Sequence, residues 1–220
     1  SRLGMVKYTG NISGFFSNLV AYGNITTNAG SLNTDILLQF ENNMKDLKYN
    51  GTIRTSSFQL GDLLSTKTLG KTAFKITTKG TKLQNRSLQG TISGDIAEIY
   101  LNSYNYQKIR VDGKYDGSGF EGKMDVNDPN LKASFDGVVD LTKKLPVFNF
   151  DLLVNNADIN ALHLTKEYKD SRLSFYGNTN MIGNSLNNLN GYLMLDSIRF
   201  INAGEELVMD QLLFESEVSG

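Results

Sequence analysis

Apolar residues recur at every second position over most of the chain. Residues 131–141 alternate in this way, and the alternation resumes over residues 148–154 after a short break at residues 142–146. A period of two residues is that of a β-strand with one apolar face, and the break suits a hairpin turn. No stretch keeps the 3.6-residue period of a helix, so the pattern predicts an all-β fold of consecutive antiparallel strands.

The alternating pattern occurs twice along the chain. When 99 is subtracted from each number, Leu131 falls on Leu32 and Phe135 falls on Ile36, and no gap is needed between about residues 19 and 64. An internal duplication indicates a stacked array of one supersecondary unit. It predicts two tandem repeats and the start of a third, over residues of about 8–106, 107–206 and 207–220.

Several glycines fall inside predicted strands, on the same face as the apolar residues two positions away. They are Gly10, Gly51, Gly90, Gly113, Gly122, Gly137 and Gly191. A strand glycine weakens the strand but permits bending and close approach of a backbone or a ligand. Only two prolines interrupt the chain. We therefore expect a long, curved antiparallel sheet with little room on its inner face, whereas Gly30 is expected in a turn.

The residues that share the face of these glycines are candidates for the inner lining of an apolar groove. They are Ile36, Leu38, Ile53, Phe74, Ile76, Ile92, Met124, Phe135, Val139, Phe148, Phe150 and Leu152. An apolar sheet face has to be covered. An open apolar trough leaves part of it for an apolar ligand, and a two-sheet β-sandwich covers it with a second sheet. The periodicity alone leaves both architectures open.

The composition limits the kinds of catalytic and binding sites that the chain can contain. The net charge is −1 with both signs interspersed, which predicts no basic face for nucleic acid. There is no cysteine, and His163 is the only histidine and corresponds to Leu64 in the first copy, so we expect it to be structural. No G-x-S-x-G motif surrounds a serine. We therefore predict no catalytic residue, no metal site and no cofactor, and we expect that the protein is not an enzyme.

Four groups of residues carry a family resemblance through their order and spacing. A turn at residues 128–131 leads into the strand pattern of residues 133–141, then Phe148 and Phe150 precede the corner at residues 157–162, and residues 185–191 read SLNNLNG before a strand. Together these motifs resemble the TamB-like and AsmA-like proteins of Gram-negative bacteria of the Bacteroides type.

The resemblance implies a non-enzymatic segment of a periplasmic protein that is anchored in the inner membrane by a part outside this sequence. Such proteins form a trough that holds phospholipid acyl chains for transport to the outer membrane. They also support outer-membrane protein assembly with an Omp85-type barrel partner, which would bind outside this segment. The alternative is a closed β-rich structural or adhesin-type module with no ligand.

The two ends of the array are expected to be unpaired sheet edges. The sequence begins without a leader peptide, which favours a segment of a longer array, and residues 207–214 carry few charges. An exposed edge presents free backbone donors and acceptors to another chain. We therefore expect edge-to-edge self-association at high concentration.

Overall fold

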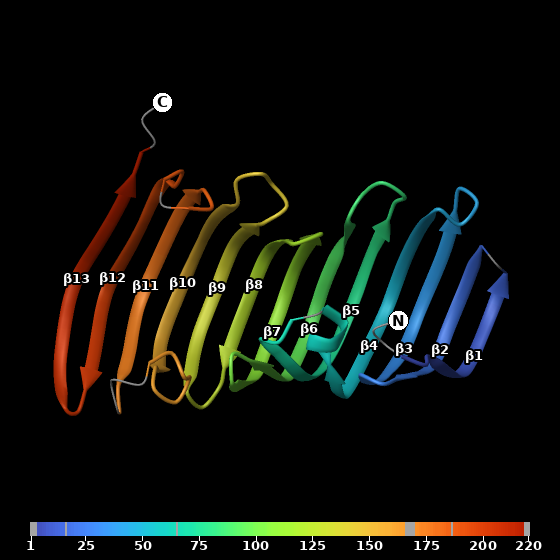
Figure 1. Cartoon of the computed structure of the whole chain (residues 1–220), viewed down its shortest axis with the longest axis horizontal. Coiled ribbons are helices and arrows are strands. Elements are labelled where there is room, and N and C mark those ends of the chain that lie inside the picture. The colour runs from blue at the N-terminus through green and yellow to red at the C-terminus, as the bar shows by residue number, and fades with distance from the viewer. Residues whose placement is uncertain (1–3, 16, 65, 166–169, 186, 218–220) are drawn as a thin grey trace. The chain divides into compact units, whose positions relative to one another are not determined.

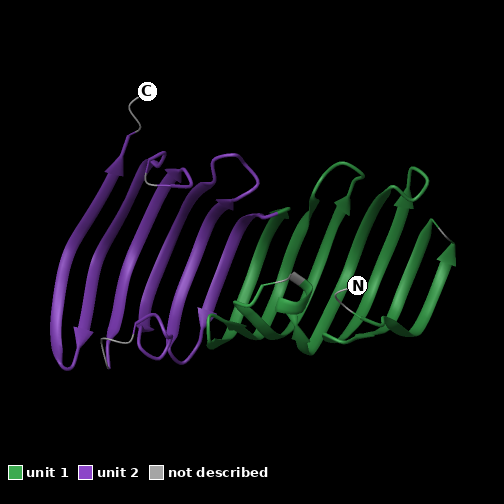
Figure 2. Cartoon of the chain, in the orientation of Figure 1, with its two compact units in different colours: residues 1–117 green, residues 118–220 purple. Residues whose placement is uncertain are grey.

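Figure 1 shows a computed structural model of the chain, which describes residues 4–15, 17–64, 66–165, 170–185 and 187–217. These residues form thirteen β-strands and one five-residue helix, and neighbouring strands pair antiparallel. The predicted all-β antiparallel fold is thus confirmed. The chain divides into two compact units, residues 1–117 and 118–220 (Figure 2). The boundary after residue 117 lies eleven residues beyond residue 106, where the sequence predicts the end of the first repeat.

Unit 1 is an open meander in which each strand pairs with the next one along the chain. Its elements are β1 (Lys7–Phe15), β2 (Asn18–Thr27), β3 (Gly30–Glu41), β4 (Asp46–Gln59), α1 (Leu60–Leu64), β5 (Leu69–Lys82), β6 (Leu88–Leu101) and β7 (Tyr104–Asp116). The helix α1 contacts β5, and the 99-residue offset places it at the counterpart of the corner at residues 157–162.

Unit 2 has the same type of sheet, again with the strands in chain order. Its strands are β8 (Gly119–Asn127), β9 (Leu131–Asp140), β10 (Val147–Asp158), β11 (Arg172–Ile182), β12 (Asn190–Asn202) and β13 (Glu205–Ser216). Leu186, which the sequence includes in the motif before this last pair of strands, lies outside the described residues.

Each unit has a small core at a corner where one strand changes register with its neighbour. In unit 1 the pairing of β4 with β5 shifts between Thr55 and Phe58, and Phe58 is 3% exposed. In unit 2 the pairing of β10 with β11 shifts between Val154 and Ala157, and Ala157 is 5% exposed. A bulge bends its strand, and these two pairs of positions differ by 99 residues. A duplication of the chain, which stays a prediction, accounts for this correspondence.

One sequence-based boundary is wrong for a related reason. The alternation predicts two strands, over residues 83–94 and 96–101, but the structure has a single strand, β6, that begins at Leu88. Its register with β5 shifts by one residue near Ala97, because Ala73 pairs with Glu98 while Phe74 pairs with Ile96. A bulge changes the phase of the alternation without ending the strand. The sequence pattern therefore indicates two strands where the structure has one.

Gly137 lies in the middle of β9 with a φ of +147°. A Cβ atom there would lie 2.5 Å from the Cα and 2.6 Å from the Cβ of Phe150 on β10. The neighbouring strand therefore leaves no space for a side chain. Gly30, expected in a turn, is instead the first residue of β3, with a φ of +133° and Ser57 O 2.5 Å from an added Cβ.

We predict that Gly137→Val lowers the free energy of unfolding by at least about 2 kcal/mol, because valine combines a strained φ with a clash against β10. Gly204→Asn is the matched control, since Gly204 has a φ of +86° and nothing within 4 Å of an added Cβ. Asparagine tolerates a positive φ, so this variant should unfold close to the parent. Urea titration measures both, and equal stabilities of the two variants would contradict the packing described for β9.

The strands β1 and β13 each pair with a single neighbour, so they are sheet edges in their units. Six large apolar side chains of β13 are at least 40% exposed: Leu207, Val208, Met209, Leu212, Leu213 and Phe214. An edge of this kind invites pairing with another chain.

We predict concentration-dependent self-association that weakens in Leu212→Pro, because proline removes a backbone donor and restricts the strand. Sedimentation velocity over a range of concentrations measures it, and circular dichroism checks that the variant is folded. A parent protein that stays monomeric throughout would show that the edges do not pair.

Candidate functional site: the apolar face of each unit

The strand register places the predicted groove residues of unit 1 on one face, because directly opposed residues point to the same side of a sheet. Four cross-strand rows cover this face from β3 to β7. They are Leu38–Tyr49–Gly80–Gly90–Tyr115, Ile36–Gly51–Thr78–Ile92–Gly113, Thr34–Ile53–Ile76–Gly94–Val111 and, from β4 onward, Thr55–Phe74–Ile96–Ile109. No charged residue occurs in these rows.

The register of unit 2 gathers the other six predicted residues in the same way. Its rows from β8 to β11 are Phe120–Val139–Phe148–Met181, Gly122–Gly137–Phe150–Thr179 and Met124–Phe135–Leu152–Gly177. These rows also lack charged residues. Each unit therefore presents a continuous uncharged face, referred to below as its apolar face.

These apolar faces are only partly shielded from solvent. All twelve predicted residues are half-buried, and none belongs to the eight buried hydrophobic residues. Within each unit, the contacts between described strands join strands that are adjacent in the sheet, and α1 contacts β5. Within each unit the described strands thus form one layer, and they do not form the two-sheet sandwich that the sequence left open.

Aromatic rings lie beside the strand glycines on these faces. In unit 2 the ring centroids of Phe120 and Phe135 are 6.1 Å apart, and those of Phe135 and Phe150 are 5.1 Å apart. The paired glycines Gly122 and Gly137 lie between these side chains in the register. Aromatic rings that cover glycines are a known way to pack a sheet. The glycines therefore make room for rings of neighbouring strands.

Unit 1 uses tyrosines in the same way, with one polar cluster inside the apolar face. Tyr49 is 7% exposed and its ring covers Gly80, where an added Cβ would lie 2.7 Å from Cζ of the ring. Its hydroxyl donates to Gln89 O at 3.0 Å and bonds the hydroxyl of Tyr115, which lies 2.9 Å from Thr78 Oγ1. Burial raises the pKa of Tyr49, and the hydrogen bond to Tyr115 adds to the rise.

The opposite face of unit 2 carries a polar network across three strands. Asp151 accepts hydrogen bonds from the Tyr176 hydroxyl at 2.5 Å and from Asn178 Nδ2 at 2.6 Å, while Tyr192 donates to Asn178 Oδ1 at 2.7 Å. The bonds from Tyr176 and Asn178 lower the pKa of Asp151. Cross-strand pairs of this kind stabilise a sheet, so unit 2 is apolar on one face and hydrogen-bonded on the other.

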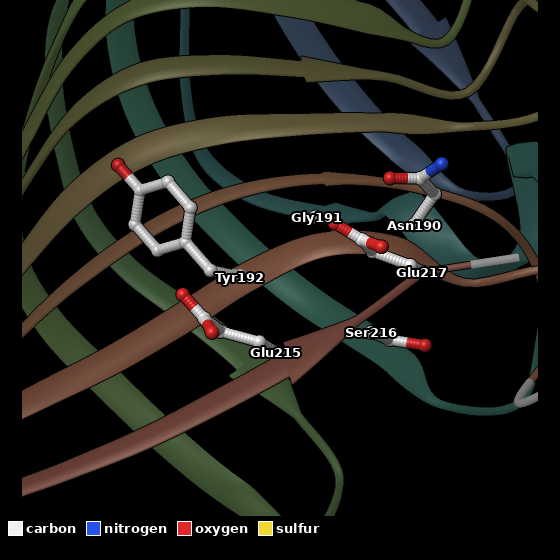
Figure 3. A pocket seen from close by; sticks show the side chains of 6 residues that line it. All are labelled: Asn190, Gly191, Tyr192, Glu215, Ser216 and Glu217. Carbon is white, nitrogen blue, oxygen red and sulfur yellow. The ribbon is translucent and has the colours of Figure 1, made fainter.

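A shallow hollow of about 300 Å³ lies where β12 begins and β13 ends (Figure 3). It is lined by Asn190, Gly191, Tyr192, Glu215, Ser216 and Glu217. In Figure 3 Glu215 lies beside Tyr192, to which it is directly opposed in the register. None of the twelve predicted residues lines this hollow, and sequence periodicity gives no signal for it.

Other chemistry is sparse in the described part of the chain. His163 is an exposed turn residue with a φ of +59°, and its backbone N–H donates to Asn160 O at 3.0 Å. Within the described ranges, no group of three His, Cys, Asp or Glu side chains could hold a metal ion. The one described helix, α1, has five residues and is too short to cross a membrane.

Neither a protein-family model, nor a curated protein, nor a solved structure matches this chain. The resemblance to TamB-like and AsmA-like proteins therefore rests on the sequence motifs alone.

We predict an alkaline loss of stability that depends on Tyr49. The folded state raises the pKa of this tyrosine above the ordinary value of about 10, so its contribution is complete below pH 10 and is lost as the pH rises through the raised value. Urea unfolding between pH 8 and 12 should show this loss, and Tyr49→Phe should flatten the pH dependence. If ultraviolet titration of the folded protein shows every tyrosine ionising near pH 10, the hydroxyl cluster is not buried as described.

Proposed function

We propose that the apolar faces bind the acyl chains of phospholipids without catalysing a reaction. The observation that carries this proposal is the alignment of uncharged, half-buried side chains in consecutive rows on one face of each unit. Soluble monomeric proteins rarely expose a large contiguous apolar patch, and such patches are typical of interaction sites. A ligand with long apolar segments matches a surface that has no charged group in its rows.

The energy of such binding comes from burial of methylene groups. Each buried CH₂ group contributes about 0.8 kcal/mol, so a chain that buries about ten of them gains roughly 8 kcal/mol before the cost of ordering the ligand. Rows of Phe, Ile, Leu and Met side chains supply this burial without specific polar contacts. This accounts for a binding surface that contains no recognisable chemical motif.

The motif resemblance supports a wider role for the same surface. In this proposal the chain is a segment of a TamB-like or AsmA-like periplasmic protein that is anchored in the inner membrane outside this sequence. It passes phospholipid toward the outer membrane, and the whole protein supports outer-membrane protein assembly with an Omp85-type barrel. The alternative, a closed structural or adhesin-type module, requires a cover over the apolar faces, and the proposal is favoured because no strand of the same unit provides one among the described residues.

We predict that Phe150→Asp strongly reduces lipid binding while the sheet stays folded. Phe150 is half-buried, so a carboxylate at this position keeps contact with water and avoids the full cost of a buried charge. The measurement is crosslinking of a photoactivatable phospholipid, together with circular dichroism.

Asn149→Asp is the matched control, because Asn149 is the adjacent, exposed residue of β10 and points to the opposite face. It adds the same charge outside the apolar face and should leave crosslinking unchanged. If Phe150→Asp crosslinks to the lipid as strongly as the parent protein, the apolar face of unit 2 is not the lipid-binding surface. Complete unfolding of this variant would indicate that the face is covered.

A further inference from the structure

The small net charge of the chain conceals opposite charges on its two units. Residues 1–117 contain 14 Lys and Arg residues and 8 Asp and Glu residues, a net charge of +6. Residues 118–220 contain 8 and 15, a net charge of −7, which together give the −1 of the whole chain. An excess of one sign on a unit raises the local concentration of ligands of the other sign. Unit 1 is therefore suited to an anion.

A hollow of about 630 Å³ lies in this basic unit, and most of its lining residues belong to the face opposite the apolar face. Leu37, Tyr49 and Gly80 also line it, and the last two belong to a row of the apolar face. Its polar side chains come from four strands: Gln39 of β3, Lys48 and Asn50 of β4, Lys79 and Thr81 of β5, and Thr91 of β6. The register sets these strands side by side, with Lys79 directly opposite both Asn50 and Thr91. The lining residues include two lysines and no aspartate or glutamate.

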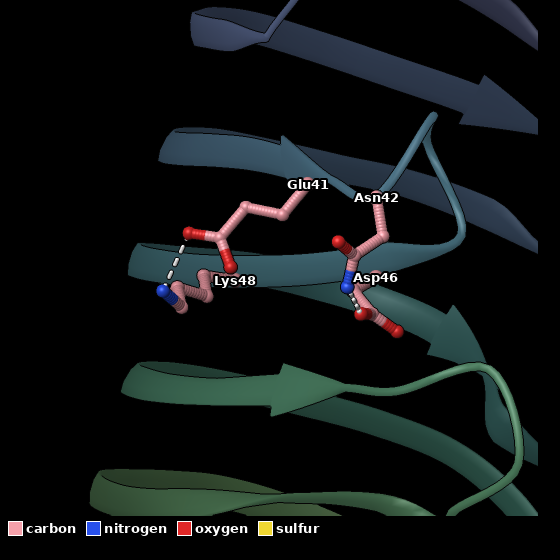
Figure 4. Close-up of polar contacts among 4 residues, drawn as sticks. All are labelled: Glu41, Asn42, Asp46 and Lys48. Atoms are coloured by element: carbon pink, nitrogen blue, oxygen red, sulfur yellow. Dashed lines mark hydrogen bonds and ion pairs between the residues drawn. The ribbon is translucent and has the colours of Figure 1, made fainter.

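The two lysines differ in their partners. Lys48 Nζ lies 2.5 Å from Glu41 Oε1, and both side chains are about half exposed (Figure 4). Asp46, the nearest other carboxylate drawn in Figure 4, is bonded by Asn42 and by the backbone N–H of Gln84. Lys79 makes no ion pair with any residue that the structure describes. One ammonium group is thus held by a displaceable surface ion pair, and the other is available to a ligand.

We propose that this hollow binds a phosphate group. Lys79 and Lys48 supply the positive charge, and Glu41 competes with the ligand for Lys48. The amides of Asn50 and Gln39 and the hydroxyl of Thr81 supply hydrogen-bond donors, whereas the hydroxyl of Thr91 donates to Lys79 O. Charge-assisted bonds from lysine to phosphate oxygens are among the stronger hydrogen bonds in proteins. The charged and polar side chains of the site differ from those of the apolar face, because they point to the other side of the sheet. The phosphate can belong to a free anion or to a lipid headgroup.

Nuclear magnetic resonance titration of the whole chain tests the site through the backbone amides of residues 48–50 and 79–81. The probes are inorganic phosphate and dihexanoyl phosphatidylglycerol below its micelle concentration, each at low ionic strength. Lys79→Gln should weaken binding about tenfold through loss of one charged contact. Glu41→Gln should strengthen it several-fold by releasing Lys48. Lys144→Gln in the exposed loop of unit 2 is the control and should change nothing.

Saturable chemical-shift changes with inorganic phosphate would show that a free phosphate anion binds the hollow. Saturable changes with the short-chain lipid but not with inorganic phosphate would show that the hollow binds a lipid headgroup. Either result supports the hollow when Lys79→Gln and Glu41→Gln move the affinity in opposite directions. Absence of saturation with both probes overturns the proposal, and so does an equal effect of Lys144→Gln. If Lys79→Gln does not fold, Lys48→Gln replaces it, with the same expected weakening. Failure of lipid to bind the apolar faces leaves these outcomes unchanged.

Discussion

The cross-strand register is the constraint on which the rest of the structure depends. A strand that alternates apolar and polar residues has an apolar face only if its neighbours are paired so that their own apolar residues point the same way. In both units the pairing achieves this, so Ile53 meets Ile76 and Phe135 meets both Met124 and Leu152. The register therefore creates both the uncharged rows of one face and the polar rows of the other. A shift of one strand's register by one residue would place polar and apolar side chains on the same face.

A single layer of strands packs its apolar residues against each other more than against a second layer. This explains why few hydrophobic residues are buried and why aromatic rings lie over glycines. The ring of Tyr49 over Gly80 stabilises the sheet within its own surface and keeps that surface smooth. Such a face can accept an apolar ligand along its length, and the proposed lipid binding follows from the same packing.

The sequence predicts much of this arrangement because strand alternation is a local property. It predicted the all-β class, and it selected residues such as Ile36 and Phe150 that the register places on the apolar faces of their units. The sequence could not predict the bulge near Ala97, because an extra residue in one strand changes the phase of the apolar alternation in the same way as a loop would. The positive φ of Gly30 and the hollow beside Lys79 depend on neighbouring strands, and no local pattern encodes them. The opposite charges of the two units are visible in the sequence only after the boundary at Gly117 is known.

The central claim is that the apolar faces are open and bind lipid. Native mass spectrometry of the chain, purified gently from cells without detergent, tests this claim most directly. The account predicts mass increments that equal those of phospholipids, and their loss after organic extraction of a still folded protein. A spectrum that contains only the polypeptide mass, together with no binding of a hydrophobic dye to the folded chain, would contradict it.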